Sequence, residues 1–188
     1  TLVGSTGYAH AVNALVADGN YVYAGTSNNG GEMVVFDVTT PSSPSMIYEV
    51  SASGGQGGIS IDLYEDTVVL GRSSGADPEL VIVDVTNPTA PSVYAEVNAT
   101  GNMNGVSMQG ADAVYAASSG NGVEFQRWDI STPTNPTLLA AYDLGSPANG
   151  SFFDGTNAYL ASSNNSQELQ IIGPSSVNID YADEGTFT

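Results

Sequence analysis

Asp37-Val-Thr-Thr-Pro41-Ser-Ser-Pro44 recurs further along the chain as Asp84-Val-Thr-Asn-Pro88-Thr-Ala-Pro91 and as Asp129-Ile-Ser-Thr-Pro133-Thr-Asn-Pro136. These copies are 47 and 45 residues apart, and a degraded fourth copy, Ile171–Ser176, follows after a similar interval. Self-similarity at a nearly fixed period is the signature of a repeat architecture. The chain is therefore predicted to consist of four units of about 46 residues.

Each unit repeats the same order of short apolar segments and turns. The first segment ends in a hairpin signal such as Asp18-Gly19 or Asp154-Gly155, where the turn requires positive φ. Later segments end at the Pro-containing link, because proline cannot donate to a β ladder. A solenoid or a tandem sandwich would also repeat, but four strands per unit are typical of a propeller blade. The prediction is an all-β chain, a β-propeller of four four-stranded antiparallel blades.

The repeats are expected at approximately 13–50, 57–97, 104–144 and 149–182 of one domain spanning 1–188, with the last fourth strand at Val177–Tyr181. Residues 1–5 align with the fourth strand of later repeats, such as 140–144, and residues 7–12 align with the link after it, such as 145–150. Residues 1–7 are predicted to be a surplus N-terminal strand.

An unpaired strand can add to the sheet of another chain. Thr1, Leu2 and Val3 are therefore candidates for strand exchange in a head-to-tail polymer. The alternatives are that the chain was cut from a larger propeller or that it is a four-bladed monomer with a frayed end.

Composition narrows the partners. Two Lys+Arg against 20 Asp+Glu give a formal charge of −18, which repels phosphate backbones and anionic lipids. The charge therefore excludes nucleic acid as a partner. No apolar stretch approaches the roughly 20 residues of a membrane helix, which excludes direct membrane insertion. The absence of cysteine excludes disulfides and thiolate metal sites. A Lys-free surface rich in hydroxyl and amide groups favours an extracellular or cell-surface location.

The third segment of each repeat carries a family resemblance. Leu80-Val81-Ile82-Val83-Asp84 resembles the motif of LVIVD-repeat propellers, and Met33–Asp37, Phe125–Asp129 and Leu169–Gly173 are relatives of it. The resemblance to this family of bacterial and archaeal surface or secreted proteins implies a propeller fold and an extracytoplasmic habit. It implies a scaffold more than any one enzyme class, because a fold does not fix a function. Gly173 departs from the pattern by replacing the aspartate.

The recurring Asp37, Asp84 and Asp129 are interpreted as structural turn residues, because an aspartate in this context accepts hydrogen bonds from the following backbone. The calcium-binding loop motif is absent, and neither a metal site nor a cofactor is predicted. The two cations, Arg72 and Arg127, are expected to pair with nearby carboxylates.

Polar residues in the links between repeats form a second candidate set. His10, Gln56, Asn104 and Asn149 occur at spacings of 46, 48 and 45 residues. They are candidates for a ring around one end of the central channel of the predicted propeller. Such a ring would bind a polar ligand, a glycan or an ion such as calcium. The alternative is that each side chain caps its own loop.

Asparagine also offers a modification site. Three sequons, at Asn98, Asn149 and Asn164, would permit N-glycosylation in a host that performs it.

Three functions remain open at this point. The first is a non-catalytic extracellular structural module, a subunit of a surface structure or filament, with self-association or other surface proteins as partners. The second is a ligand- or ion-binding propeller that uses the polar link residues. The third is a hydrolase or lyase with a pair of carboxylates from different blades. The lone His10 excludes a histidine pair elsewhere, and no nucleophile motif accompanies it.

Overall fold

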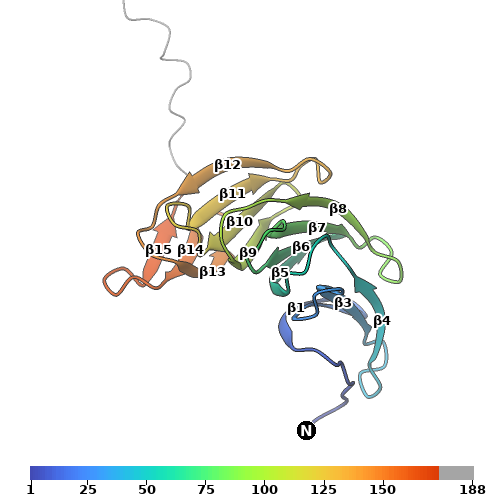
Figure 1. Cartoon of the computed structure of the whole chain (residues 1–188). Coiled ribbons are helices and arrows are strands. Elements are labelled where there is room, and N and C mark those ends of the chain that lie inside the picture. Colours follow the sequence, from blue (N-terminus) through green and yellow to red (C-terminus); the bar gives the residue numbers. More distant parts are fainter. Residues whose placement is uncertain (174–188) are drawn as a thin grey trace, which may run out of the picture.

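The computed structural model describes residues 1–173, which contain strands and no helix (Figure 1). The strands form four antiparallel sheets in chain order, called here sheets 1 to 4. Sheet 1 contains β1 (Val12–Asp18), β2 (Tyr21–Thr26), β3 (Met33–Asp37) and β4 (Ser45–Val50). Sheet 2 contains β5 (Gly58–Tyr64), β6 (Thr67–Arg72), β7 (Leu80–Asp84) and β8 (Ser92–Val97). Sheet 3 contains β9 (Met103–Gln109), β10 (Ala113–Ser118), β11 (Phe125–Asp129) and β12 (Thr137–Tyr142). Sheet 4 contains β13 (Ala148–Phe153), β14 (Ala158–Ser162) and β15 (Leu169–Ile172).

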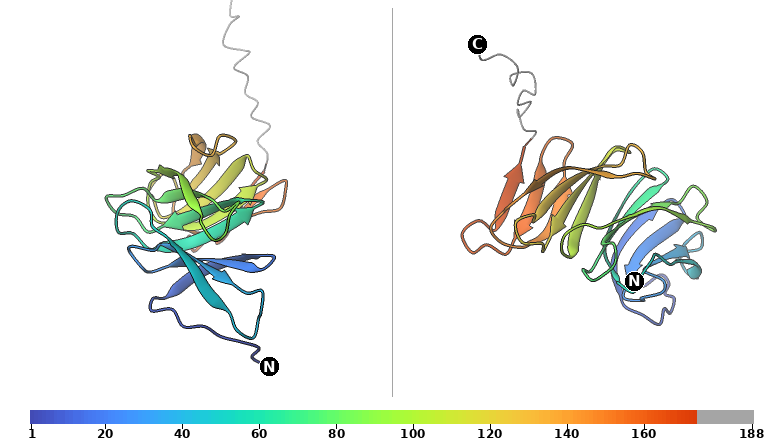
Figure 2. Two further views of the ribbon diagram at one scale, coloured as in Figure 1. Left: turned by 90° about the vertical axis from the view of Figure 1, so that its right-hand side faces the viewer. Right: turned by 45° about the horizontal axis from the view of Figure 1, so that its top comes forward.

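The four sheets follow one another along an open arc (Figures 1 and 2). Within each sheet the strands lie in sequence order, and the first strands β1, β5, β9 and β13 contact one another from sheet to sheet. The arc does not close over residues 1–173, so sheets 1 and 4 form its two ends. No helix in this part of the chain is long and apolar enough to cross a membrane.

Tight hairpins join the first and second strand of each sheet. Gly19, Gly110 and Gly155 have φ of +54°, +59° and +96° in these turns, a region in which glycine meets no steric cost. In sheet 2 the non-glycine residue Glu65 has φ of +49° instead. The hairpin signals in the sequence therefore fall where the chain reverses.

The core lies between successive sheets. Each sheet has a forward face, which packs on the next sheet, and a backward face, which packs on the one before. The LVIVD stretch of β7 divides between the two faces: Leu80 and Ile82 join the cluster shared with sheet 3, whereas Val81 and Val83 join the cluster shared with sheet 1. All four side chains are fully buried. Burial on both faces explains why this strand is a continuous apolar run rather than an alternating one.

The two ends of the chain differ from the expectation. Residues 1–7 were predicted to be a strand, but Thr1–Ala11 contain none, because the backbone of residues 1–7 joins no ladder with a strand of the described chain. This segment lies against sheet 1 instead: Gly4 touches the Pro41–Ser42 backbone, and the Tyr8 ring packs edge-on against Phe36. The predicted fourth strand Val177–Tyr181 lies outside the described residues.

Candidate functional site

The aspartate that ends the third strand organises the link after it. The backbone N–H groups of Thr39, Thr86 and Ser131 donate to Oδ1 of Asp37, Asp84 and Asp129 at 2.8, 2.9 and 2.9 Å. Hydrogen bonding from the side-chain hydroxyl of the same residue, together with these backbone bonds, lowers the pKa of each carboxyl group below its ordinary value. The three aspartates are therefore occupied within their own turns and do not converge on one point.

These aspartates are expected to contribute stability that disappears in acid. Because their pKa is lower in the folded chain than the ordinary 3.8, the contribution is fully present above pH about 4 and is lost as the pH falls through the lowered pKa. Thermal unfolding midpoints measured from about pH 6 to about pH 2 test this. The variant with Asp37→Asn, Asp84→Asn and Asp129→Asn is expected to lose less stability over that interval than the wild type. Parallel curves for the two proteins would contradict the expectation.

The four polar link residues do not occupy equivalent positions. The strand registers place Val12, Gly58, Met103 and Ala148 at matching starts of the first strands. His10 and Gln56 therefore lie two residues before a first strand, whereas Asn104 and Asn149 lie one residue inside one. The link from β4 to β5 is two residues longer than the link from β8 to β9, so a regular sequence spacing does not produce a ring.

Asparagine inside the first strand connects neighbouring sheets. Asn13 Nδ2 donates to the Gly58 carbonyl and Asn104 Nδ2 donates to the Ala148 carbonyl, both at 2.8 Å. Asn149, at the same position of sheet 4, donates to Ser163 Oγ at 2.8 Å instead.

Among the sequons, Asn98 and Asn149 are exposed, and the Asn164 Oδ1 atom accepts the Ser166 N–H at 2.9 Å.

A buried glutamate precedes the third strand in sheets 1 to 3, and the sequence interpretation missed it. One carboxylate oxygen of Glu32, Glu79 and Glu124 accepts the backbone N–H twenty residues ahead, each at 2.9 Å. The donors lie in the links to the next sheet and are Ala52, Ala99 and Leu144. The signal was present in the sequence, because Glu32, Glu79, Glu124 and Glu168 recur with the same period as the aspartates.

Arg72 is fully buried at the end of β6, where the other sheets have Thr26, Ser118 and Ser162. Its guanidinium donates to the carbonyls of Ser53, at 2.8 Å, and Pro78. Its Nε has no hydrogen-bond partner within the described part of the chain. Backbone carbonyls, and not the expected carboxylate, therefore hold this cation.

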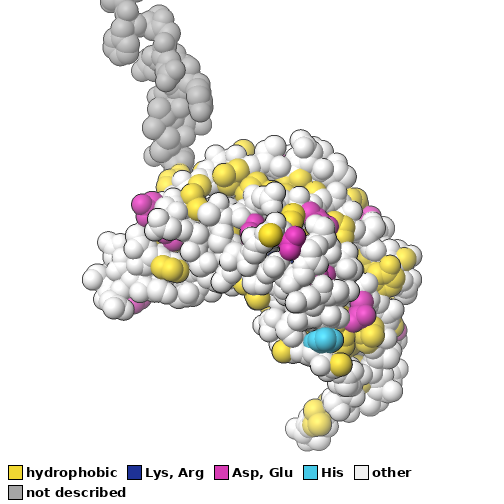
Figure 3. Space-filling model, in the orientation of Figure 1, with side chains coloured by type: hydrophobic (Ala, Val, Ile, Leu, Met, Phe, Trp, Pro, Cys, Tyr) yellow, Lys and Arg dark blue, Asp and Glu magenta, His cyan; other side chains and the backbone are white. Residues whose placement is uncertain are grey.

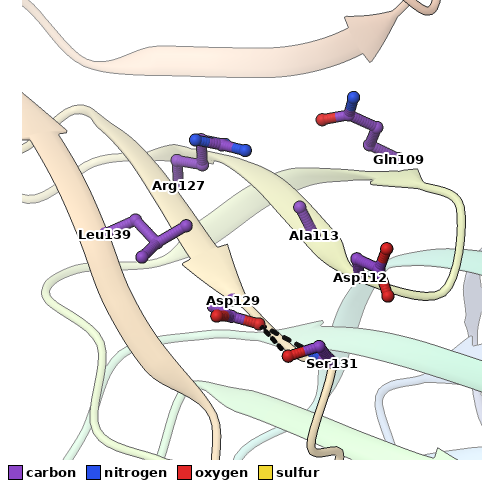
Figure 4. Close-up of a pocket in the computed structure, with 7 residues that line it drawn as sticks. All are labelled: Gln109, Asp112, Ala113, Arg127, Asp129, Ser131 and Leu139. Carbon is purple, nitrogen blue, oxygen red and sulfur yellow. Dashed lines mark hydrogen bonds between the residues drawn. The ribbon is translucent and has the colours of Figure 1, made fainter. Parts of the chain in front are cut away.

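Arg127 lies in a cleft of about 410 Å³ on sheet 3, lined by Gln109, Asp112, Asp129 and Leu139 among others (Figure 4). The guanidinium carbon is 5.7 Å from the centre of the Tyr115 ring, a distance compatible with a cation–π contact. Asp129 is already bonded to Ser131. The cleft therefore holds one cation and two carboxylates, a polar but not strongly anion-attracting environment (Figure 4).

Acidic side chains lie at separate points of the face seen in Figure 3, not in one cluster. Residues 1–173 contain no group of three or more His, Asp and Glu side chains that could hold a metal ion.

Sheet 4, at one end of the arc (Figure 1), exposes large apolar side chains. Leu169 and Ile171 of β15 are 64% and 55% exposed, although the side chains at the matching positions of β7 are fully buried. Phe152 of β13 is also exposed. Within residues 1–173, β15 pairs only with β14, so its outer edge is unpaired. This surface, with its free edge, is the candidate functional site.

Comparisons with known proteins agree with the repeat pattern. The model of the LVIVD repeat matches residues 7–52, 76–99 and 128–144. No curated protein sequence matches the chain. Among solved structures, the computationally designed Ika4 protein has a TM-score of 0.69 at 15% identity, covering 92% of this chain and 97% of its own.

Two larger structures are also similar. The designed Ika8 protein has a TM-score of 0.67 at 15% identity, covering 90% of this chain and 48% of its own. The β-propeller domain of Cps50 (Swd1) from Myceliophteria thermophila has a TM-score of 0.65 at 16% identity, covering 88% and 55%. The chain thus spans about half the length of these two structures. The motifs, the four stacked sheets and the matching repeat model together show that the chain belongs to the LVIVD-repeat proteins, whose fold here is similar to that of β-propellers.

Proposed function

We propose that this chain is a non-catalytic structural module that works outside the cell, a four-bladed propeller unit of a surface or filamentous polymer joined by strand exchange. The observation that carries the proposal is the edge of β15 at the end of the arc, which pairs with no strand of residues 1–173 and lies beside the exposed Leu169 and Ile171. A free strand edge next to an apolar face is a template for strand addition by another chain.

The acidic groups that recur in each repeat support a structural role. The aspartates at the ends of the third strands and the glutamates before these strands accept backbone hydrogen bonds within the chain. Groups that hold the turns and links of sheets 1 to 3 are not available as a catalytic pair. The formal charge of −18 keeps separate copies apart at low ionic strength, so assembly requires a specific contact.

Sedimentation velocity on the full chain tests this function. We expect species larger than one copy to increase with protein concentration, and to increase further with salt, because salt screens the repulsion between acidic copies. Deleting Thr1–Gly7 is expected to suppress the larger species. The matched control is Leu138→Asp, because Leu138 is exposed on β12, an edge strand of sheet 3, which is not one of the two end sheets of the arc. A wild-type chain that stays a single copy at every concentration would contradict the proposal.

A second candidate function is supported by the cleft around Arg127. Gln109, Asp112 and Arg127 present hydrogen-bonding groups next to Leu139, which suits a neutral polar ligand such as a glycan. Titration of the wild type and of Arg127→Ala with common glycans and with calcium separates the two functions. Saturable binding that Arg127→Ala abolishes would favour the ligand-binding role.

A further inference from the structure

The junctions between sheets inside the chain have a common construction. The fourth strand of one sheet leads through a short link into the first strand of the next. At each junction a buried glutamate accepts a backbone N–H of the link at 2.9 Å. The forward face of the first sheet is apolar and is covered by the backward face of the second. Two of the three junctions add an asparagine that donates to the next first strand.

Sheet 4 carries side chains at the positions that form a junction in the other sheets, but no sheet of residues 1–173 packs on its forward face. Glu168 occupies the position of Glu124 and is exposed, and no residue of the described chain donates to its carboxylate. Asn149 occupies the position of Asn104. Leu169 and Ile171 continue the apolar forward face. A terminal repeat that needs no neighbour has a polar outer face, and sheet 4 does not have one.

Residues 1–11 carry the complementary half of a junction. The first residues of β1 and β13, Val12 and Ala148, replace the alignment expected from the sequence alone: at their offset Thr1–Ala11 correspond to Thr137–Pro147, which form β12 and its link to sheet 4. The first two residues are Thr and Leu in both segments. Tyr8 corresponds to Leu144, the residue whose N–H binds Glu124. Val12 then corresponds to Ala148, the start of a first strand.

We propose that a second copy of this chain completes sheet 4. Residues 1–6 of the second copy add to β15 as the fourth strand, and the backward face of its sheet 1 covers Leu169 and Ile171. Glu168 accepts the backbone N–H of Tyr8 from the second copy, as Glu124 accepts that of Leu144. This inference rests on the proposed self-assembly and specifies its contact surfaces and register. Both closed rings and open polymers are built from this one junction.

Three observations favour a second copy over the same chain. The chain's own N-terminus lies at the opposite end of the arc from sheet 4 in both views of Figure 2. Gly173 lacks the carboxylate with which Asp37, Asp84 and Asp129 organise the link to a fourth strand. Residues 1–7 carry no acidic side chain, whereas residues 174–188 contain Asp180, Asp183 and Glu184, which would repel Glu168.

Cross-linking between two single-cysteine variants tests the register. The wild type has no cysteine. The residues opposite the first residue of each third strand are Val50, Val97 and Tyr142, and the offset places Thr6 at that position of sheet 4. We expect Thr6→Cys and Leu169→Cys, mixed under mild oxidation, to form a disulfide between the two variants. Directly opposed cross-strand residues lie at a compatible separation. Mixtures of Leu138→Cys with either variant serve as controls.

The result that would overturn the junction is a mixture in which the Thr6→Cys and Leu169→Cys pair links no more than the controls do. Because Leu169 is exposed, Leu169→Asp tests the same surface without disturbing the core, and circular dichroism checks its fold. It is expected to weaken association by about tenfold or more. Glu168→Ala is expected to weaken association, and Glu168→Gln, which keeps an acceptor oxygen, to weaken it less.

The experiments can contradict the proposed junction without contradicting the proposed polymer, and the reverse. A dimer that contains the Thr6–Leu169 cross-link would support the junction and contradict the filament. Polymers that form equally well with Leu169→Asp would support the assembly function and contradict the junction. A chain that remains a single copy and forms no cross-link would overturn both.

Discussion

Replacing Arg72 with alanine is expected to lower the free energy of unfolding by about 3 to 5 kcal/mol. The side chain is fully buried, and its guanidinium satisfies the carbonyls of Ser53 and Pro78. Alanine would leave both acceptors without these donors and would open a cavity between sheets 1 and 2. The cavity costs free energy because it replaces a fully buried side chain, and the part-buried carbonyls lose two charge-assisted hydrogen bonds. Urea unfolding followed by circular dichroism measures the change.

Arg127→Ala is the matched control, because Arg127 is the only other cation in the chain. Arg127 is partly exposed and stacks over Tyr115, so its removal is expected to cost about 1 kcal/mol or less. Equal losses in the two variants would show that the carbonyl contacts of Arg72 contribute nothing beyond its charge. Arg72→Lys keeps the charge but not the forked pair of donors, and is expected to fall between wild type and Arg72→Ala.

The repeat was predictable from the sequence because both faces of a third strand are buried. Leu80 and Ile82 face one neighbouring sheet and Val81 and Val83 the other, so the whole strand must be apolar. The Pro-containing link and the Asp-Gly turns then mark where strands end. Local chemistry of this kind can be identified without coordinates, because each signal acts on its immediate neighbours in the chain.

The polar contacts between sheets were less predictable. His10, Gln56, Asn104 and Asn149 are evenly spaced, but a link that varies by two residues places them at different positions. Arg72 was expected to pair with a carboxylate but binds backbone carbonyls instead. The sequence alone does not show which carbonyls surround a buried side chain. These contacts depend on how one sheet sits on the next, which the period of the repeat does not specify.

Glu124→Ala is expected to destabilise the chain by about 2 to 4 kcal/mol. The buried carboxylate accepts the N–H of Leu144 at 2.9 Å and that of Gly122 at 3.0 Å. Its removal would leave a buried backbone donor unpaired where the chain passes from sheet 3 to sheet 4, a loss for which alanine provides no replacement. Thermal and urea unfolding of the purified variant measure the effect.

Glu168→Ala is the matched control for the loss of stability expected in Glu124→Ala. Glu168 has the same place in its repeat but is exposed, so its replacement is expected to change the unfolding free energy of a single copy by about 0.5 kcal/mol or less. If Glu124→Ala proves equally mild, the repeated glutamates do not hold the links between sheets. If instead Glu124→Ala unfolds a single copy while Glu168→Ala affects only association, the contact between the repeated glutamate and a backbone N–H of the link serves two purposes. Inside the chain it joins consecutive sheets, and at the end of the arc it joins one copy to another.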